Sequence, residues 1–209
     1  MALLWELYLS PDGLSASELA RRLETQRTAL YRLLRPFLRS QFIRRGDRKK
    51  YYLGLGITAL ARAVAQPIES VAHRPLQTLA DETGCSAMII ADTDGVLLTV
   101  ISATPRQPGM YVTSPNGFVH QGNDLAMRAI LAGRPPSPSD EAEVREDRDR
   151  GYATNEHDGF VTTIALPLTA SVIGAPACLL VASLTALTPA EIAGRAAEAV
   201  REITVASDR

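Results

Sequence analysis

The stretch SASELARRLETQRTALYRLLRPFLRSQFIRR, residues 15–45, contains the pattern that decides the fold of the first part of the chain. Its apolar residues recur at the spacing of one helical face: Leu30, Leu33, Leu34, Phe37 and Leu38. We expect that face to be buried. The opposite face is basic and poor in acids, with Arg27, Thr28, Tyr31, Arg32, Arg35 and Arg39. It is therefore either a solvated surface or a contact for a polyanion.

Shorter signals around this helix predict a helix-turn-helix followed by a wing. Ser15 and Glu18 have the spacing of a capping box, so a short helix is expected to begin there, and Thr25 is expected to cap the longer helix. Two helices joined by a tight turn are typical of a helix-turn-helix, whose second helix enters the major groove of DNA. The segments QFIRR and KKYYL, joined by GDR, predict a β-hairpin that forms the wing, with Phe42, Tyr51 and Leu53 covering the helices.

Two residues set limits on this motif. Pro36 lies inside the longer helix, where it removes one backbone hydrogen bond, so we expect a kink that confines base reading to residues 26–35. Glu24 occupies the turn, where many such motifs use glycine. A positive φ at that position would strain a residue with a side chain.

The charge of the chain is divided unevenly, although the net charge is only −1. Residues 1–62 contain twelve Lys and Arg and five acids, a local charge of +7; the remainder contains ten basic and eighteen acidic residues, a local charge of −8. A basic module joined to an acidic body is typical of a nucleic-acid reader attached to a second domain.

Composition and spacing exclude several classes of protein. The 209 residues, 46% of them hydrophobic, suffice for two small domains. No apolar run reaches the ~18 residues of a membrane span, and MALLWELYLSPDG lacks the features of a signal peptide, so we expect a cytoplasmic protein without a membrane partner. Cys85 and Cys178 have no CxxC spacing, which favours reduced thiols in a core over a disulfide or a metal pair.

Catalysis is not indicated. The three histidines, His73, His120 and His157, lie in no HExxH spacing, and the sequence has no GxSxG elbow and no glycine-rich phosphate loop after a strand. Asp92 and Asp94 flank a turn and are read as turn residues. We therefore predict no enzyme activity, no metal and no cofactor.

The rest of the chain predicts an α+β domain. After a linking helix interrupted near Pro67 and a second helix ending at Gly84, the strand-like segments are CSAMIIAD, GVLLTVISA, GMYVTS, VTTIALPL and ACLLVASL. Helices are expected at NDLAMRAILAG, in the charged segment that follows, and from Thr188 onward. Antiparallel strands with helices at the ends and on one face indicate a sensor-like domain. The predicted division is 1–54 for the winged helix-turn-helix, 55–69 for the linker helix and 70–209 for the second domain.

These blocks, in this order, resemble the IclR family of bacterial transcriptional regulators. The resemblance rests on ELARRLETQRTALYRLLRPFLRSQFIRRGDRKKYYLGLGITALA, RPLQTLADETG and RDRGYATNEHDGFVTTIALPL, followed by the last strand and helix, and it covers nearly the whole chain. It implies a homodimer or a dimer of dimers that binds double-stranded operator DNA. It also implies a C-terminal domain that binds a small-molecule effector, often a small organic or aromatic acid.

The resemblance assigns residues to both functions. The DNA-binding residues it implies are Gln26, Arg27, Thr28, Tyr31 and Arg32. The basic face of the helix up to Pro36 adds Arg35, and the tip of the predicted wing adds Arg48, Lys49 and Lys50. The effector-binding residues it implies by position are Asn123, Asp124, Met127, Thr162, Thr163 and Ser183.

The effector motif departs from the family pattern. In GNDLAMRAILA, Met127 stands where glycine is usual, and Arg128 takes the basic position. A helix N-terminus offers N–H groups to an anion, but Asp124 would repel one unless it caps the helix. Two alternatives stay open: these residues are structural caps and strand hydroxyls, or the second domain only dimerises and binds no effector.

Overall fold

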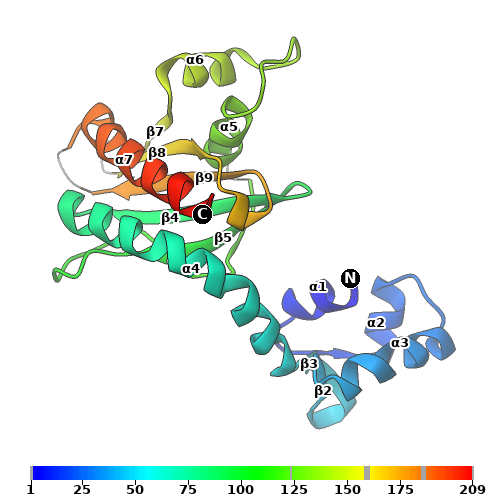
Figure 1. Cartoon of the computed structure of the whole chain (residues 1–209). Coiled ribbons are helices and arrows are strands. Elements are labelled where there is room, and N and C mark those ends of the chain that lie inside the picture. The colour runs from blue at the N-terminus through cyan, green and yellow to red at the C-terminus, as the bar shows by residue number, and fades with distance from the viewer. Residues whose placement is uncertain (1, 123, 158–160, 185–186, 209) are drawn as a thin grey trace. The chain divides into compact units, whose positions relative to one another are not determined.

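The computed structural model describes residues 2–122, 124–157, 161–184 and 187–208, apart from the side chains of residues 156 and 157. The chain forms two compact units, Met1–Val64 and Ala65–Arg209 (Figure 1). The predicted three-part division, 1–54, 55–69 and 70–209, stays a prediction.

The first unit is a winged helix-turn-helix, as the sequence predicts. Its helices are α1 (Ala2–Tyr8), α2 (Ala16–Arg22) and α3 (Arg27–Arg39). A three-stranded antiparallel sheet in the order β1-β3-β2 forms the wing, from β1 (Leu14–Ser15), β2 (Ile43–Arg45) and β3 (Lys50–Leu53), with a 3-10 turn at Asp47–Lys49. The short β1, which the sequence analysis did not predict, pairs Leu14 with Tyr51.

The capping box at the start of α2 is confirmed. The Ser15 N–H donates to Glu18 Oε2 over 2.8 Å, and the Glu18 N–H donates to Ser15 Oγ over 3.3 Å. The expected cap of α3 was wrong, because Gln26 holds the N-cap position and makes no side-chain cap bond. Thr25 still belongs to the preceding turn, where its N–H donates to the Ala20 carbonyl over 2.9 Å.

The apolar face of α3 is buried only in part. Leu30 and Leu34 are fully buried, and Phe37 and Leu38 pack against the same core. Leu33 is 41% exposed, contrary to the expectation for this stripe. Leu33 and Leu34 are about 100° apart around the helix, so the core centred on Leu30 and Leu34 leaves Leu33 at its edge. The helix includes Pro36 and continues to Arg39.

Helix α4 (Gly56–Thr83) is a single 28-residue helix that contains both Pro67 and Pro75. The expected interruption near Pro67 was wrong. A proline removes one helical hydrogen bond, but the buried stripe that includes Ile68, Leu76 and Leu79 belongs to the core of the second unit. Tertiary packing of this kind contributes most of the stability of helices in proteins.

The second unit is built on a six-stranded antiparallel sheet in the order β6-β5-β4-β9-β8-β7. The strands are β4 (Ser86–Thr93), β5 (Val96–Ala103), β6 (Val119–His120), β7 (Ala153–His157), β8 (Val161–Leu168) and β9 (Ala177–Ser183). The helices after α4 are α5 (Asp124–Ala132), α6 (Ala142–Arg150) and α7 (Pro189–Ser207), with a 3-10 turn at Ser171–Ile173. Helix α7 begins with the predicted capping box of Thr188 and Glu191.

The segment GMYVTS is not a strand. Its Ser114 N–H donates to Met88 Sδ over 3.3 Å, so it does not enter a backbone ladder, and β6 takes the place beside β5 instead. Strand β7, at the opposite edge of the sheet, was also missed.

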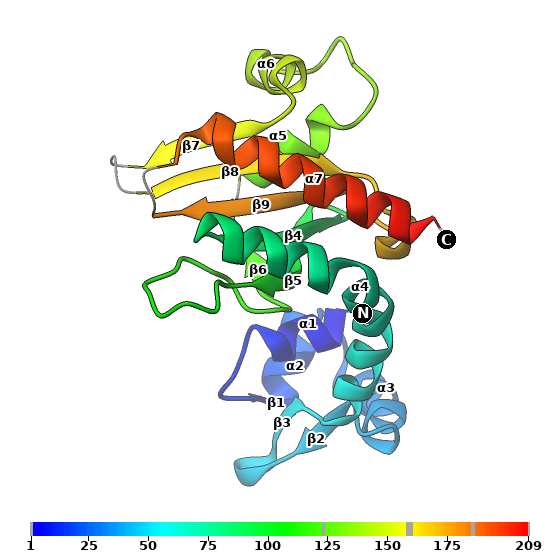
Figure 2. The same ribbon diagram turned by 60° about the vertical axis from the view of Figure 1, so that its left-hand side comes forward.

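Helices cover both faces of the sheet, not one face as expected. Helices α4 and α7 lie over one face and α5 lies over the other (Figure 2). Strand β9 alternates between the two cores: Ala177, Leu179 and Val181 face one, and Cys178, Leu180 and Ala182 face the other. Central strands buried on both sides are apolar throughout, which hides the alternation in the sequence.

Both cysteines are free and buried, as predicted. Burial raises the pKa of the Cys178 thiol to about 12. None of the helices in the described part of the chain is long and apolar enough to cross a membrane.

Candidate DNA-binding face and effector pocket

The polar face of α3 is open to solvent. Burial of Leu30 and Leu34 turns the opposite side of the helix outward, and all six residues predicted to read DNA from this segment are exposed: Gln26, Arg27, Thr28, Tyr31, Arg32 and Arg35. The Arg27 guanidinium donates through Nη2 to the Ser17 hydroxyl of α2. It therefore lies across the turn of the motif.

Glu24 has a left-handed backbone conformation, with φ of +48°. Its N–H donates to the Arg21 carbonyl over 3.3 Å, which closes the end of α2 before α3 begins. The strain anticipated from the sequence is therefore present in the turn of the motif.

The wing presents a run of cations. Arg48 and Lys49 are exposed at its tip, both with positive φ. The Lys50 side chain is already hydrogen-bonded within the chain, because its ammonium donates to the Asp12 carbonyl over 3.1 Å. Two further arginines that were not predicted to bind DNA, Arg44 and Arg45, are exposed on β2. The Arg44 guanidinium lies 4.5 Å from the centre of the Tyr52 ring.

The predicted effector residues are divided by the sheet. Thr163 and Asp124 line one cavity on the α5 side. Thr162 pairs with Ser183, and alternation along β8 and β9 places both on the opposite face, toward α4 and α7. Met127 packs against the core beneath α5 and does not line that cavity. Asn123 lies outside the described residues.

The cavity has a volume of about 450 Å³ and combines apolar walls with polar side chains. Its described lining is Met88, Val112, Thr113, Ser114, His120, Gln121, Gly122, Asp124, Leu125, Asn155, Thr163, Leu180 and Ala182. A volume in this range is typical of small-molecule sites. Three of these lining residues were not predicted. Ser114 and His120 lie outside the blocks that carry the resemblance, and Asn155 lies within RDRGYATNEHDGFVTTIALPL but was not singled out there.

One wall of the cavity is a hydrogen-bonded cluster. The buried Thr99 hydroxyl lies 2.7 Å from Ser114 Oγ and 2.7 Å from His120 Nε2. Phe118 packs edge-on against the imidazole, with ring centres 5.0 Å apart. Burial lowers the pKa of His120, which favours the uncharged imidazole.

A buried polar atom lies on the face of the sheet that the cavity occupies. Ser86 Oγ is fully buried and has no hydrogen-bond partner among the described residues. Ser86 pairs with Ala182, a lining residue, on the same face of the sheet. An unpaired buried hydroxyl is costly, so a bound molecule or water near it would be stabilising.

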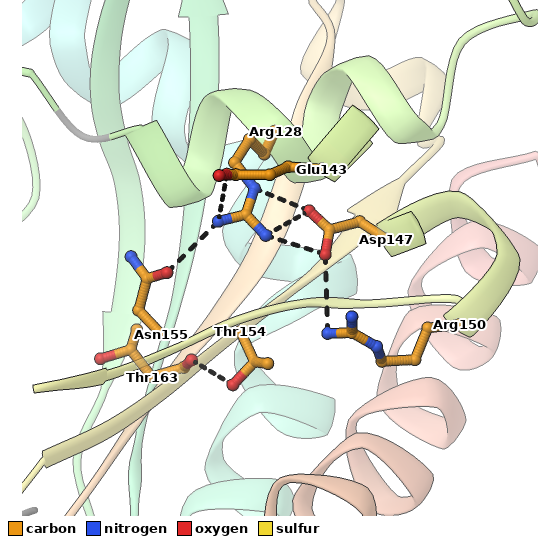
Figure 3. Close-up of polar contacts among 7 residues, drawn as sticks. All are labelled: Arg128, Glu143, Asp147, Arg150, Thr154, Asn155 and Thr163. Atoms are coloured by element: carbon orange, nitrogen blue, oxygen red, sulfur yellow. Dashed lines mark hydrogen bonds and ion pairs between the residues drawn. The ribbon is translucent and has the colours of Figure 1, made fainter. Parts of the chain in front are cut away.

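A cluster of charged side chains adjoins the cavity (Figure 3). Arg128 forms a two-pronged pair with Asp147: Nε lies 2.8 Å from Oδ2, and Nη2 lies 2.9 Å from Oδ1. Its Nη1 lies 3.2 Å from Glu143 and donates to Asn155 Oδ1 over 3.3 Å. The Asp147 side chain is fully buried. Arg128 therefore joins α5 to α6 and to the cavity wall at Asn155.

The charges around the cavity do not form an anion site of the usual kind. No lysine or arginine is among its described lining residues, whereas Asp124 is. Within the described residues, no three His, Cys, Asp or Glu side chains are grouped so that they could hold a metal ion.

The chain has the fold of IclR-type transcriptional regulators. An IclR transcriptional regulator from Alicyclobacillus acidocaldarius matches it with a TM-score of 0.73 and 21% identity, over 99% of this chain and 96% of that one. An IclR family transcriptional regulator from Brucella abortus matches with a TM-score of 0.77 and 20% identity, over 98% of this chain and 90% of that one. An IclR homolog from Microbacterium hydrocarbonoxydans, in complex with 4-hydroxybenzoate, matches with a TM-score of 0.70 and 14% identity, over 94% of this chain and 92% of that one.

No family sequence profile and no curated protein sequence matches the chain. The structural matches confirm, at the level of the fold, the resemblance found in the sequence.

Proposed function

We propose that the chain is a DNA-binding transcriptional regulator of the IclR type, not an enzyme, whose operator binding is modulated by a small molecule held in the cavity beside α5. The observation that carries this proposal is the combination, in one chain, of a winged helix-turn-helix with an exposed basic reading face and a second unit with a polar-lined cavity of about 450 Å³.

The DNA-binding part of the proposal rests on charge and exposure. Helix α3 offers its first two turns to the major groove, and the wing offers Arg48 and Lys49 to the phosphates. Arginine that grips guanine O6 and N7 contributes discrimination of roughly 1–3 kcal/mol, whereas arginine on phosphate contributes affinity alone. We assign Arg27 and Arg32 to the first role and the wing to the second.

The effector part rests on the state of the cavity. Met127, the residue that departs from the family pattern, is half-buried against the core and does not line the cavity. This supports ligand binding over the alternative in which the second unit only dimerises. The bound 4-hydroxybenzoate of the Microbacterium relative supports a small aromatic molecule as the general kind of effector.

We further propose a homodimer, or a dimer of dimers, that binds a pseudo-palindromic site. Large apolar side chains at the start of α4 and just before it support self-association: Leu55 is 80% exposed, Leu60 53% and Val64 68%. Exposed apolar surface of this kind is typical of a protein interface.

Selection of bound sequences from a random DNA pool tests the DNA-binding part. Arg27→Ala should relax base preference at one position of each half-site. Arg39→Ala, the control at the far end of α3, should leave the preference unchanged. Identical motifs for wild type and Arg27→Ala would show that α3 does not read bases.

The wing is tested by salt dependence. Replacing Arg48, Lys49 and Lys50 with alanine should weaken binding to all DNA sequences alike. It should also flatten the plot of log affinity against log salt by roughly one unit per lost phosphate contact. An unchanged slope would remove the wing from the interface.

The effector part is tested by a thermal-shift screen of small aromatic molecules, in which hits are repeated on Thr163→Ala and on Ser183→Ala. Thr163→Ala should weaken binding, whereas Ser183→Ala changes the other face of the sheet and serves as the control. A true effector must also bind free and operator-bound protein with different affinity, because coupling between two sites is reciprocal.

A further inference from the structure

We propose that Asn155 presents its amide nitrogen to the cavity and that Arg128 is the positioning residue that fixes this orientation. The cavity therefore selects an uncharged ligand with a hydrogen-bond acceptor over a ligand of the same shape that carries a carboxylate. The inference rests on the proposed function in one respect, that the cavity beside α5 is the ligand site.

The orientation of Asn155 follows from the chemistry of its neighbour. A guanidinium has five N–H donors and no acceptor, so the atom of Asn155 that faces Arg128 must be the oxygen. Arg128 Nη1 donates to Asn155 Oδ1 over 3.3 Å. The amide nitrogen points away from the guanidinium (Figure 3). Asn155 lines the cavity, so the group it offers a ligand is a donor.

Arg128 is held firmly enough to set this orientation. The Asp147 carboxylate grips it through two nitrogens, with contacts from 2.7 to 2.9 Å, and the Arg128 side chain is only 17% exposed. Paired contacts of this kind fix the plane of the guanidinium as well as its position. Rotating the Asn155 amide by 180° would turn its N–H₂ group toward a guanidinium that can only donate.

The charge of Arg128 is not available to an anion in the cavity. Asp147 and Glu143 together carry two negative charges against it, and Arg150 Nη1, 3.6 Å from Asp147, offsets one of them. The described lining contains no lysine or arginine and does contain Asp124. The lowered pKa of His120 keeps that ring uncharged near neutral pH.

A carboxylate that entered the cavity would leave water without gaining a partner charge, which is unfavourable. An uncharged carbonyl would accept from Asn155 at a much smaller desolvation cost. This differs from the expectation, drawn from the resemblance alone, that the effector is an organic or aromatic acid.

Three probes of the same shape but different charge test the proposal: benzoate, benzamide and benzamidine. Isothermal titration of the full-length wild type, without DNA, should show benzamide binding at least about tenfold more tightly than benzoate. Asn155→Asp keeps an oxygen for Arg128 but replaces the donor in the cavity with an acceptor. The preference of this variant should shift by about tenfold or more from benzamide toward benzamidine.

Two further variants separate positioning from general damage. Asn116→Asp makes the same chemical change at a residue outside the cavity lining, where Oδ1 still accepts from the Ser102 N–H, and should leave all three affinities unchanged. Arg128→Lys retains a positive charge for Asp147 but loses the planar guanidinium that contacts Asp147 and Asn155 at once. Because the Asn155 amide is then no longer held in one orientation, the preference for benzamide over benzamidine should become smaller. Circular dichroism should show that the fold remains intact.

Three outcomes would overturn the proposal: tighter binding of benzoate than of benzamide, an unchanged preference in Asn155→Asp, or no measurable binding of any probe. None of these outcomes bears on operator binding. Failure of the DNA selection described above would instead count against the proposed function and leave the titrations valid.

Discussion

Replacing Glu24 with glycine should stabilise the first unit, although it removes every side-chain atom beyond Cα. Glu24 lies in the turn between α2 and α3 with φ of +48°, and its side chain is exposed. A left-handed conformation places Cβ too close to the following carbonyl oxygen, whereas glycine has no Cβ. The substitution relieves strain in the folded state at a position where little side-chain packing is lost.

The expected gain is the difference between two opposing terms. The left-handed conformation costs a residue with a side chain roughly 1–2 kcal/mol. Glycine adds freedom to the unfolded chain, which lowers stability by roughly 0.4–1 kcal/mol. The net effect of Glu24→Gly should be a gain of about 0.5–1 kcal/mol in the free energy of unfolding of the first unit.

Trp5 makes this measurable in the full chain, because it is the only tryptophan in the sequence and lies in α1 of the first unit. With a urea dependence near 1 kcal/mol per molar for a unit of this size, the fluorescence midpoint should rise by about 0.5–1 M. Ala29→Gly, an exposed helical position of α3, is the control and should lose about 1 kcal/mol. If the midpoint of Glu24→Gly falls together with that of the control, the assignment of strain to Glu24 is wrong.

Three further predictions concern the second unit. Arg128→Met should lower the free energy of unfolding by about 3–5 kcal/mol, because it leaves the buried Asp147 without its main partner. Arg106→Met, at an ion pair whose arginine side chain is 75% exposed, should cost less than ~1 kcal/mol, and equal losses by chemical denaturation would refute the distinction. Burial holds the pKa of His120 below its ordinary value of 6.5, so the unfolded chain takes up this proton first as pH falls. The contribution of His120 to stability should be complete above that value and decrease below it, and thermal unfolding of His120→Gln should lack this part of the pH dependence. Because the pKa of Cys178 is raised to about 12, its thiol should not react with a disulfide reagent at pH 8 until the unit unfolds, and rapid labelling of native protein would contradict the burial.

Local signals predicted the elements whose cause is local. The capping boxes at Ser15 and Thr188 and the 3.6-residue spacing of Leu30 and Leu34 depend on neighbours within a few residues, and each appears in the structure. The break that Pro67 predicts in α4 is absent, because packing of distant residues against the helix outweighs the local loss of one hydrogen bond. The segment around Ser114 has a strand-like composition but bonds to side chains of the sheet.

The candidate ligand site could be predicted only in part, because its assembly depends on strand register. Thr162 and Thr163 are adjacent in sequence, yet alternation along β8 places them on opposite faces, and only Thr163 lines the cavity. Asn155 reaches the cavity because β7 pairs with β8 and sets it opposite Thr163. A single sequence does not contain that pairing, so neither Asn155 nor its contact with Arg128 was predicted.

The pairing of Arg128 with Asp147 also restricts how this chain can evolve. Loss of either residue alone leaves a charge without its counterpart in the interior, so single substitutions at these positions are disfavoured unless the partner changes as well. Asn155 is bonded to the same guanidinium, which places a cavity residue under the same constraint. We therefore expect Arg128, Asp147 and Asn155 to vary together among descendants of this chain. A change of ligand chemistry at this wall would then require several coordinated replacements, whereas the rest of the cavity can vary one residue at a time.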